Sequence, residues 1–166
     1  MEMINFTIFC DGGVSKYTNK EGYYGGIGSV ILNEHNELET EISEHFEDTT
    51  NNQMELLAFI NSIKYIKEHY VGIPEMNIHV ISDSNYLITG CNEWINAWKA
   101  NNWRTYSKQP VKNLTLWKEI DLIINEPDKM FMFEWVKAHQ SNATTDAKGR
   151  WNNRADVLAS MGKEKK

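Results

Sequence analysis

Three β-rich segments follow one another at the start of the chain, and a helical pattern begins only after them. Residues 3–9, 24–32 and 38–46 are rich in β-branched and aromatic side chains, and the turn-forming sequence Asp-Gly-Gly at 11–13 follows the first. Strands joined in this order without an intervening helix form an antiparallel meander. We expect the acidic third strand to lie at the edge of the sheet, where its glutamates discourage pairing with another molecule.

A capping box predicts where the first helix begins. Thr50 and Gln53 form the Ser/Thr and Glu/Gln pair of this motif. Apolar side chains recur behind the box at helical spacing, at Leu56, Phe59, Ile60, Ile63 and Ile66.

The rest of the chain alternates between strand-like and helix-like segments: a strand at 76–81, a short helix after Ser84, helices near 93–100 and 113–125, and a fifth strand at 130–136. The final helix is expected to begin at Asn152 or Asn153, because asparagine is a good N-cap. Strands separated by helices pair in parallel, so the predicted class is α/β with a parallel half after the antiparallel start.

Length and hydrophobic content predict one globular domain over residues 1–166. The chain has 166 residues, 41% of them hydrophobic, and a chain of this length buries roughly 70% of its surface on folding without a metal or disulfide. Cys10 and Cys91 can form at most one bridge. The N-terminus lacks a basic leader, and no apolar run approaches about eighteen residues. We therefore expect a cytoplasmic protein with no membrane span and a frayed Lys-rich end from about 161 to 166.

Charge is distributed unevenly along the chain. The net charge of −6 by itself argues against a nucleic acid as partner. Residues 34–48 hold seven acidic residues and no Lys or Arg, whereas residues 94–118, which we term the basic segment, hold five basic residues and no acid. In the basic segment Trp94, Trp98 and Trp103 alternate with positive charges, as in nucleic-acid grooves. The spacing of Trp94 and Trp98 fits an apolar helix stripe equally well, so core packing is the alternative.

Four acidic residues stand where the expected elements begin or end. Asp11 follows the first strand, Asp83 follows the fourth, and Glu55 and Asp156 lie in the first turns of two helices. Ligand sites gather beyond the carboxyl ends of parallel strands, and helix N-termini favour anions. If the two parallel strands are neighbours, the four carboxylates converge, and such a cluster stays ionised only with cations.

The ligand type narrows the choice of metal. Carboxylate oxygens favour Mg²⁺ or Mn²⁺ over Zn²⁺, and the chain has no Cys and His spacing typical of zinc. Each acid alone also fits a structural role: Asp11 in a turn, Glu55 and Asp156 at helix starts, and Asp83 as a helix cap. Convergence of the four is what favours a metal site.

Five motifs occur in a specific order: FCDGG around Asp11, TTNNQMELLAF around Glu55, ISDSNYL around Asp83, EWVKAHQ around His139 and NNRADVLA around Asp156. Together they resemble type 1 ribonuclease H. WINAWKANNWRT followed by PVKNLTLW looks like the substrate-binding handle of the bacterial members. The resemblance implies a ribonuclease-H-like fold: a five-stranded mixed sheet, three antiparallel strands and then two parallel, with helices on both faces.

The activity that the resemblance implies is hydrolysis of the RNA strand of RNA–DNA hybrids, leaving 5′-phosphate and 3′-hydroxyl ends. Asp11, Glu55, Asp83 and Asp156 would hold two Mg²⁺ ions, with Mn²⁺ as a possible substitute. His139, on a mobile loop, would help proton movement or the exit of metal and product. The family also implies a monomer with no obligate protein partner.

The resemblance further implies contacts to both strands of the hybrid. Those to the RNA strand come from the backbone of Cys10 and Gly12 and from Asn51, Glu55 and Asn85. Those to the DNA strand come from Thr50, Asn52, Trp94 and Asn113. The basic segment would add Trp98, Trp103, Lys99, Arg104, Lys108 and Lys112, whose charges attract phosphates regardless of sequence. For Thr50, Asn51 and Asn52, helix capping is the simpler interpretation, and the two roles are compatible.

Two features depart from the family pattern. Asp48 stands where many members have an Arg beside the DNA phosphate pocket, and the polar segment between His139 and Asp156 is longer than usual. Two other classes remain open: a protein that binds hybrids without cutting them, and a domain of a larger machine such as a reverse transcriptase. The four intact acids and the start at Met1 favour a free-standing enzyme.

Overall fold

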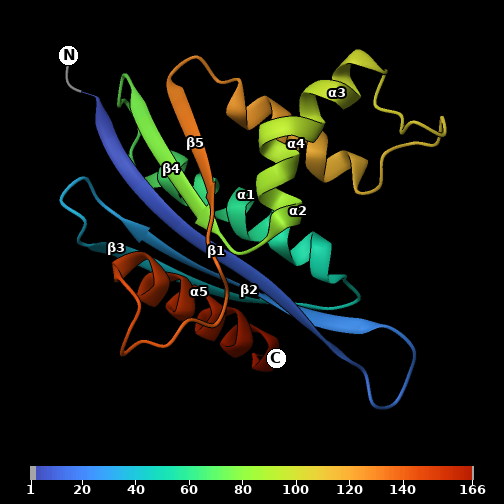
Figure 1. Cartoon of the computed structure of the whole chain (residues 1–166), viewed down its shortest axis with the longest axis horizontal. Coiled ribbons are helices and arrows are strands. Elements are labelled where there is room, and N and C mark those ends of the chain that lie inside the picture. The colour runs from blue at the N-terminus through green and yellow to red at the C-terminus, as the bar shows by residue number, and fades with distance from the viewer. Residues whose placement is uncertain (1–2, 166) are drawn as a thin grey trace.

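A five-stranded mixed sheet forms the centre of the computed structural model, which describes residues 3–165. Its strands are β1 (Ile4–Lys16), β2 (Tyr23–Leu32), β3 (Leu38–Phe46), β4 (Met76–Ser82) and β5 (Lys129–Trp135). Their order across the sheet is β3-β2-β1-β4-β5, with β1, β2 and β3 antiparallel and β4 and β5 parallel to β1 (Figure 1). The predicted meander and the predicted edge position of the acidic strand are confirmed.

Helices cover both faces of the sheet, as predicted. They are α1 (Asn51–His69), α2 (Asn85–Thr89), the π-helical turn η1 (Gly90–Trp94), α3 (Ile95–Ala100), α4 (Leu114–Ile124) and α5 (Ala147–Glu164). One hydrophobic cluster joins the sheet to α1, α2 and α4, and a smaller one joins it to α5. Figure 1 shows α5 on its own side of the sheet, with the other helices opposite.

The capping box at the start of α1 is confirmed. The Gln53 N–H donates to Thr50 Oγ1 at 3.2 Å, and the Thr50 N–H donates to Gln53 Oε1 at 3.1 Å. All five apolar residues of the predicted stripe are buried. The capping box therefore sets where α1 begins, and the apolar stripe sets which face of the helix is buried. Both features are visible in the sequence.

The prediction that β1 ends near Asp11 is wrong. Pairing with β4 stops at Phe9, but pairing with β2 continues from Asp11 to Lys16, so the run at 11–13 is strand and not a turn. The physical reason lies in the tertiary structure. β2 offers backbone hydrogen-bond partners along residues 11–16, and the glycines let the backbone of β1 continue beneath α1. Asp11 still lies just past the end of the parallel pairing, where the site was expected.

The predicted start of the last helix is also wrong. The N-cap is Asp146, whose Oδ1 accepts a 3.0 Å hydrogen bond from the Gly149 N–H. Asp156 therefore lies in the middle of α5 and not in its first turns. The helix continues to Glu164, which corrects the expected fraying of 161–164. Residue 166 lies outside the described part of the chain.

Gly28 of β2 is required by the close approach of α5. A Cβ atom at Gly28 would lie 2.3 Å from the Ala155 carbonyl oxygen and 2.3 Å from the Ala159 nitrogen. Because both are backbone atoms of a helix, neither can give way locally. We expect Gly28→Ala to lower the free energy of unfolding by about 3 kcal/mol, measured by urea denaturation.

Gly13 of β1 is the matched control, because nothing lies within 4 Å of the Cβ that an alanine would add there. Gly13→Ala should be neutral or stabilising by up to about 1 kcal/mol. Equal stability of the two variants would show that α5 is not held at this distance from the sheet.

Candidate active site

Three carboxylates from three different elements meet at one end of the sheet. Asp11 comes from β1, Glu55 from the second turn of α1, and Asp83 from the residue directly after β4. One oxygen atom from each carboxylate lies within 4.8 Å of those of the other two. The predicted convergence is confirmed for these three residues.

Gly12 allows α1 to approach β1 closely enough to form the cluster. A Cβ atom at Gly12 would lie 2.4 Å from the carbonyl carbon of Met54 and 2.6 Å from the nitrogen of Glu55. The Gly12 N–H donates to Asp11 Oδ1 at 2.9 Å and to Glu55 Oε1 at 3.2 Å. Gly12 thus has two effects: its lack of a side chain lets the two carboxylates come close, and its N–H binds both of them.

Burial sets the electrostatics of the cluster. Asp11 and Glu55 are each 5% exposed. Burial raises the pKa of Asp11 well above its ordinary range, and the charges of Glu55 and Asp83 raise it further. Burial also raises the pKa values of Glu55 and Asp83. Three carboxylates in this setting retain protons unless cations compensate their charge.

Asp83 is held by two donors that the sequence analysis did not identify. Asn152 Nδ2 donates to Asp83 Oδ2 at 3.1 Å and lowers the pKa of that carboxyl against the effect of burial. Trp135 Nε1 donates to the Asp83 backbone oxygen at 3.0 Å. Asn152 was interpreted as a helix cap, and no local pattern distinguishes a cap from a buried amide that reaches a distant carboxylate.

Asp156 and His139 lie at the outer side of the cluster. The side chain of Asp156 is 40% exposed, and His139 Nδ1 lies 3.7 Å from Asp156 Oδ2. The charge of Asp156 contributes to the raised pKa of Asp83. Asp156 thus borders the three-carboxylate group, and the structure places the predicted histidine beside it.

The donor set fits a hard divalent cation. Within the described residues, Glu55 Oε2 is a buried oxygen that has no hydrogen-bond partner. An orphaned carboxylate oxygen among two other carboxylates is a ligand position for Mg²⁺ or Mn²⁺, which prefer oxygen ligands. Asp11, Glu55 and Asp83 can therefore hold a metal ion, with Asp156 adjacent.

Polar side chains predicted to contact substrate stand at the starts of α1 and α2, the first of which also carries Glu55. Thr50, Asn51 and Asn52 are exposed at the N-terminus of α1, and Asn85 is exposed in the first turn of α2. Cys10 is fully buried, backbone included. Gly12 already donates its N–H to the carboxylates.

The tryptophans of the basic segment pack on one another. The Trp98 ring centroid lies 5.2 Å from that of buried Trp117, with Trp94 at 5.8 Å and Trp103 at 6.4 Å from Trp98. Trp98 and Trp103 are half-buried against the core, which supports the core-packing alternative for them. Trp94 is 37% exposed and presents the most accessible ring of the three.

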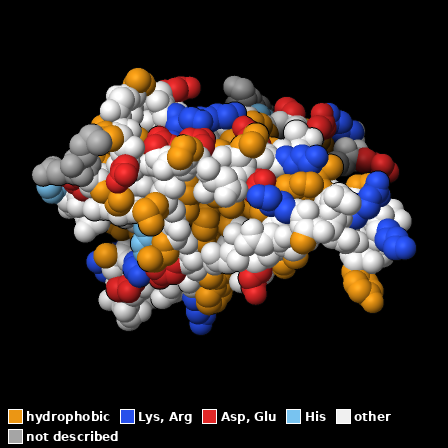
Figure 2. Space-filling model, turned by 90° about the horizontal axis from the view of Figure 1, so that it is seen from above, with side chains coloured by type: hydrophobic (Ala, Val, Ile, Leu, Met, Phe, Trp, Pro, Cys, Tyr) orange, Lys and Arg blue, Asp and Glu red, His pale blue; other side chains and the backbone are white. Residues whose placement is uncertain are grey.

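The basic side chains differ in how freely their charges face solvent. Lys99 Nζ lies 3.2 Å from Asp121 Oδ1, so its charge is partly compensated. Arg104, Lys108 and Lys112 are exposed. Asn113 is half-buried, and its Nδ2 donates to the Tyr86 hydroxyl at 3.1 Å. In Figure 2, Lys and Arg side chains project at the right-hand end, which the basic segment forms.

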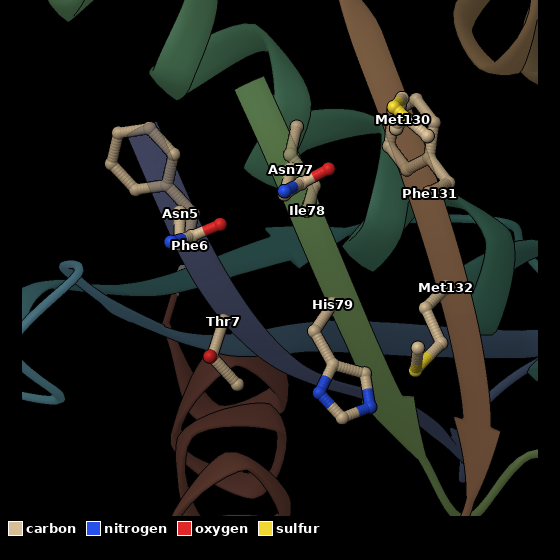
Figure 3. Close-up of a pocket in the computed structure, with 9 residues that line it drawn as sticks. All are labelled: Asn5, Phe6, Thr7, Asn77, Ile78, His79, Met130, Phe131 and Met132. Carbon is tan, nitrogen blue, oxygen red and sulfur yellow. The ribbon is translucent and has the colours of Figure 1, made fainter. Parts of the chain in front are cut away.

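A separate hollow of about 440 Å³ is lined by residues of β1, β4 and β5 and by none of the carboxylates. Thr7, His79 and Met132 are among the side chains that line it (Figure 3). None of the four acids lines it. Its lining mixes apolar side chains with amide, hydroxyl and imidazole groups and offers no cluster of catalytic groups, so the carboxylate site remains the candidate.

Comparisons with known proteins agree with the geometry. A profile of the RNase H family matches residues 4–164. Ribonuclease H of Ehrlichia canis is 38% identical over 158 residues, covering 95% of this chain and 94% of the relative. Ribonuclease H of Ruthia magnifica is 40% identical over 119 residues, 72% of each chain. The solution structure of the PFV RNase H domain superposes with a TM-score of 0.78 at 24% identity, covering 98% of this chain and 96% of that domain.

Proposed function

Because the chain belongs to the ribonuclease H family of endonucleases that act on RNA–DNA hybrids, we propose that Asp11, Glu55, Asp83 and Asp156 are the catalytic carboxylates and hold two Mg²⁺ ions. The observation that supports this most is the buried three-carboxylate cluster with its unpartnered Glu55 oxygen. Bound there, the ions would activate the attacking water and stabilise the leaving 3′ oxygen, which leaves 5′-phosphate and 3′-hydroxyl ends.

The protein itself contributes orientation. The Gly12 amide holds Asp11 and Glu55 in one arrangement. Asn152 binds the side chain of Asp83, and Trp135 binds its backbone oxygen. Ligands that are fixed before substrate binds need little reorganisation during the reaction. In this proposal the carboxylates are ligands and not nucleophiles.

His139 is proposed to move protons or to help product leave. Its side chain is 79% exposed and stands beside Asp156 at the border of the site. An accessible imidazole can exchange protons with solvent.

We propose that one group of residues contacts the RNA strand of the substrate and a second group contacts the DNA strand. The backbone of Cys10 and Gly12, with Asn51 and Asn85, would face the RNA strand, where the 2′-hydroxyl distinguishes RNA from DNA. Contacts to the DNA strand would come from Thr50, Asn52, Trp94 and Asn113, and from the positive charges of the basic segment. We further propose that the chain is a single domain that works as a cytoplasmic monomer. No helix in residues 3–165 is long and apolar enough to cross a bilayer.

The proposed activity is tested on four matched substrates. An end-labelled RNA–DNA hybrid, double-stranded DNA, double-stranded RNA and single-stranded RNA are incubated with Mg²⁺, Mn²⁺ or EDTA. We expect cutting of the RNA in the hybrid alone, and none in EDTA. Tight hybrid binding without cutting of any substrate would place the protein among binding modules.

Neutralising the basic segment should weaken substrate binding more than catalysis. For Arg104→Gln and Lys112→Gln we expect a higher KM, an almost unchanged kcat, and a slope of log(kcat/KM) against log salt that is smaller by about one per residue. Lys99→Gln should have less effect, because Asp121 already compensates its charge.

Lys67→Gln, at the opposite end of α1 from the site, is the control and should leave the salt dependence unchanged. A fall in kcat at constant KM in the Arg104 and Lys112 variants would contradict a role in substrate binding.

A further inference from the structure

The segment between His139 and α5 is folded on itself. The Ser141 carbonyl accepts hydrogen bonds from the Thr144 N–H at 3.1 Å and the Thr145 N–H at 2.8 Å. Thr145 Oγ1 donates to Gln140 Oε1 at 3.0 Å, and Gln140 Nε2 donates to the Lys137 carbonyl at 2.9 Å. These bonds give the loop a shape of its own, but they do not place it relative to the carboxylates.

Two side chains of α5 connect this loop to the helix. Arg150 Nη1 donates to the Thr145 carbonyl at 2.8 Å, near the start of the helix. Asn153 Nδ2 donates to the Gln140 carbonyl at 2.6 Å and to Asn142 Oδ1 at 2.7 Å, close to His139. An amide nitrogen has two hydrogens, and both of those of Asn153 have an acceptor in this loop.

His139 combines an exposed side chain with an unfavourable backbone conformation. Its side chain is 79% exposed, and its backbone has a φ of 56°, a left-handed conformation that costs a residue with a Cβ atom about 1 kcal/mol or more. Such a conformation persists only where neighbouring contacts impose it. Asn153 binds the carbonyl of Gln140, the residue directly after His139.

Asn153 and Asp156 lie on the same face of α5. Residues three apart on a helix are neighbours, so Asn153 stands one turn before the carboxylate that His139 approaches at 3.7 Å. The adjacent Asn152 reaches Asp83. One turn of α5 thus carries Asp156, which borders the cluster, and Asn153, which binds the loop that bears the histidine.

We propose that Asn153 is a positioning residue for catalysis: by binding the backbone directly after His139, its amide holds the imidazole beside Asp156. This inference rests on the role of His139 in the proposed function. Asn153 acts through the loop and contacts neither substrate nor metal. Without it, the loop retains its internal bonds and its Arg150 anchor but loses the attachment nearest to His139.

The test compares Asn153→Ala, His139→Ala and the double variant. We expect Asn153→Ala to lower kcat about tenfold with a change in KM of less than about twofold, because a misplaced group costs rate and not binding. His139→Ala should lower kcat at least as much. The double variant should match His139→Ala within about twofold, because a loop without its histidine has nothing left to position.

A second readout is independent of the reaction. In the metal-free protein, amide hydrogen exchange of residues 139–146 should accelerate in Asn153→Ala, while the rest of α5 keeps its protection. The matched control is Asn61→Ala on α1, which also removes one helical asparagine with a side-chain bond, here to Glu44 Oε2 at 3.3 Å. Asn61→Ala should change neither kcat nor exchange of the loop.

The outcomes separate the two proposals. Wild-type kcat in Asn153→Ala together with an impaired His139→Ala overturns the positioning role alone. An equal further loss when Asn153→Ala is added to His139→Ala also overturns it, because that loss does not pass through the histidine. Wild-type kcat in His139→Ala refutes the proposed role of His139 and the positioning inference with it, while the carboxylate assignment stands.

Discussion

Asp11→Asn is expected to abolish cleavage while the fold and hybrid binding are retained. The substitution preserves shape but replaces a buried anionic ligand by a neutral amide at the centre of the three-carboxylate cluster. Cation stabilisation of the reacting phosphate contributes several kcal/mol, so the rate should fall by at least about a thousandfold. Single-turnover cleavage and hybrid binding in Ca²⁺ would measure the two effects separately.

The same substitution should stabilise the protein when no metal is bound. Burial and two neighbouring carboxylates raise the pKa of Asp11, so ionised Asp11 is unfavourable in the folded state. Asp128→Asn, next to Lys129 and outside the cluster, is the control and should leave cleavage intact. Cleavage by Asp11→Asn at more than about a tenth of the wild-type rate would refute the metal-ligand assignment.

Removal of divalent metal is expected to abolish activity and to make stability fall as pH rises. Asp11 and Glu55 have raised pKa values in the folded state, so above the ordinary carboxyl pKa near 4 the folded protein holds more protons than the unfolded chain. Stability then decreases with pH, by up to about 1.4 kcal/mol per pH unit for each excess proton. Urea unfolding in EDTA from pH 5 to pH 8 measures this slope.

Two comparisons make the pH experiment specific. Saturating Mg²⁺ should flatten the slope and raise stability at pH 8, because a ligand that binds the folded state alone stabilises it. Asp11→Asn should flatten it without metal. Carboxyls with lowered pKa values, such as Glu41 beside Arg154, act below the chosen range, where they lose their contribution as pH falls. A stability that rises with pH in EDTA would contradict the raised pKa values.

The elements that follow local rules were predicted well. The capping box of α1, the apolar stripe behind it and the whole of β3 agree with the structure because caps and periodicity act over a few neighbouring residues. The start of α5 was misplaced because several polar residues before Asp156 are acceptable caps, and the structure uses Asp146. The extra length of β1 depends on its partner strand and has no local signal.

The sequence by itself predicted the four acids and the basic segment from residue type and position along the chain, and it predicted His139 only through the resemblance of its motifs to a known family. Only the tertiary structure decided how they meet. Gly12 lets Glu55 approach Asp11 because no Cβ atom lies between them. Asn152 binds Asp83 from a helix that comes much later in the chain. Asn153 donates a hydrogen bond to the loop directly after His139. Such contacts join atoms far apart in the chain, and their energies depend on distance and burial, which no spacing along a sequence contains.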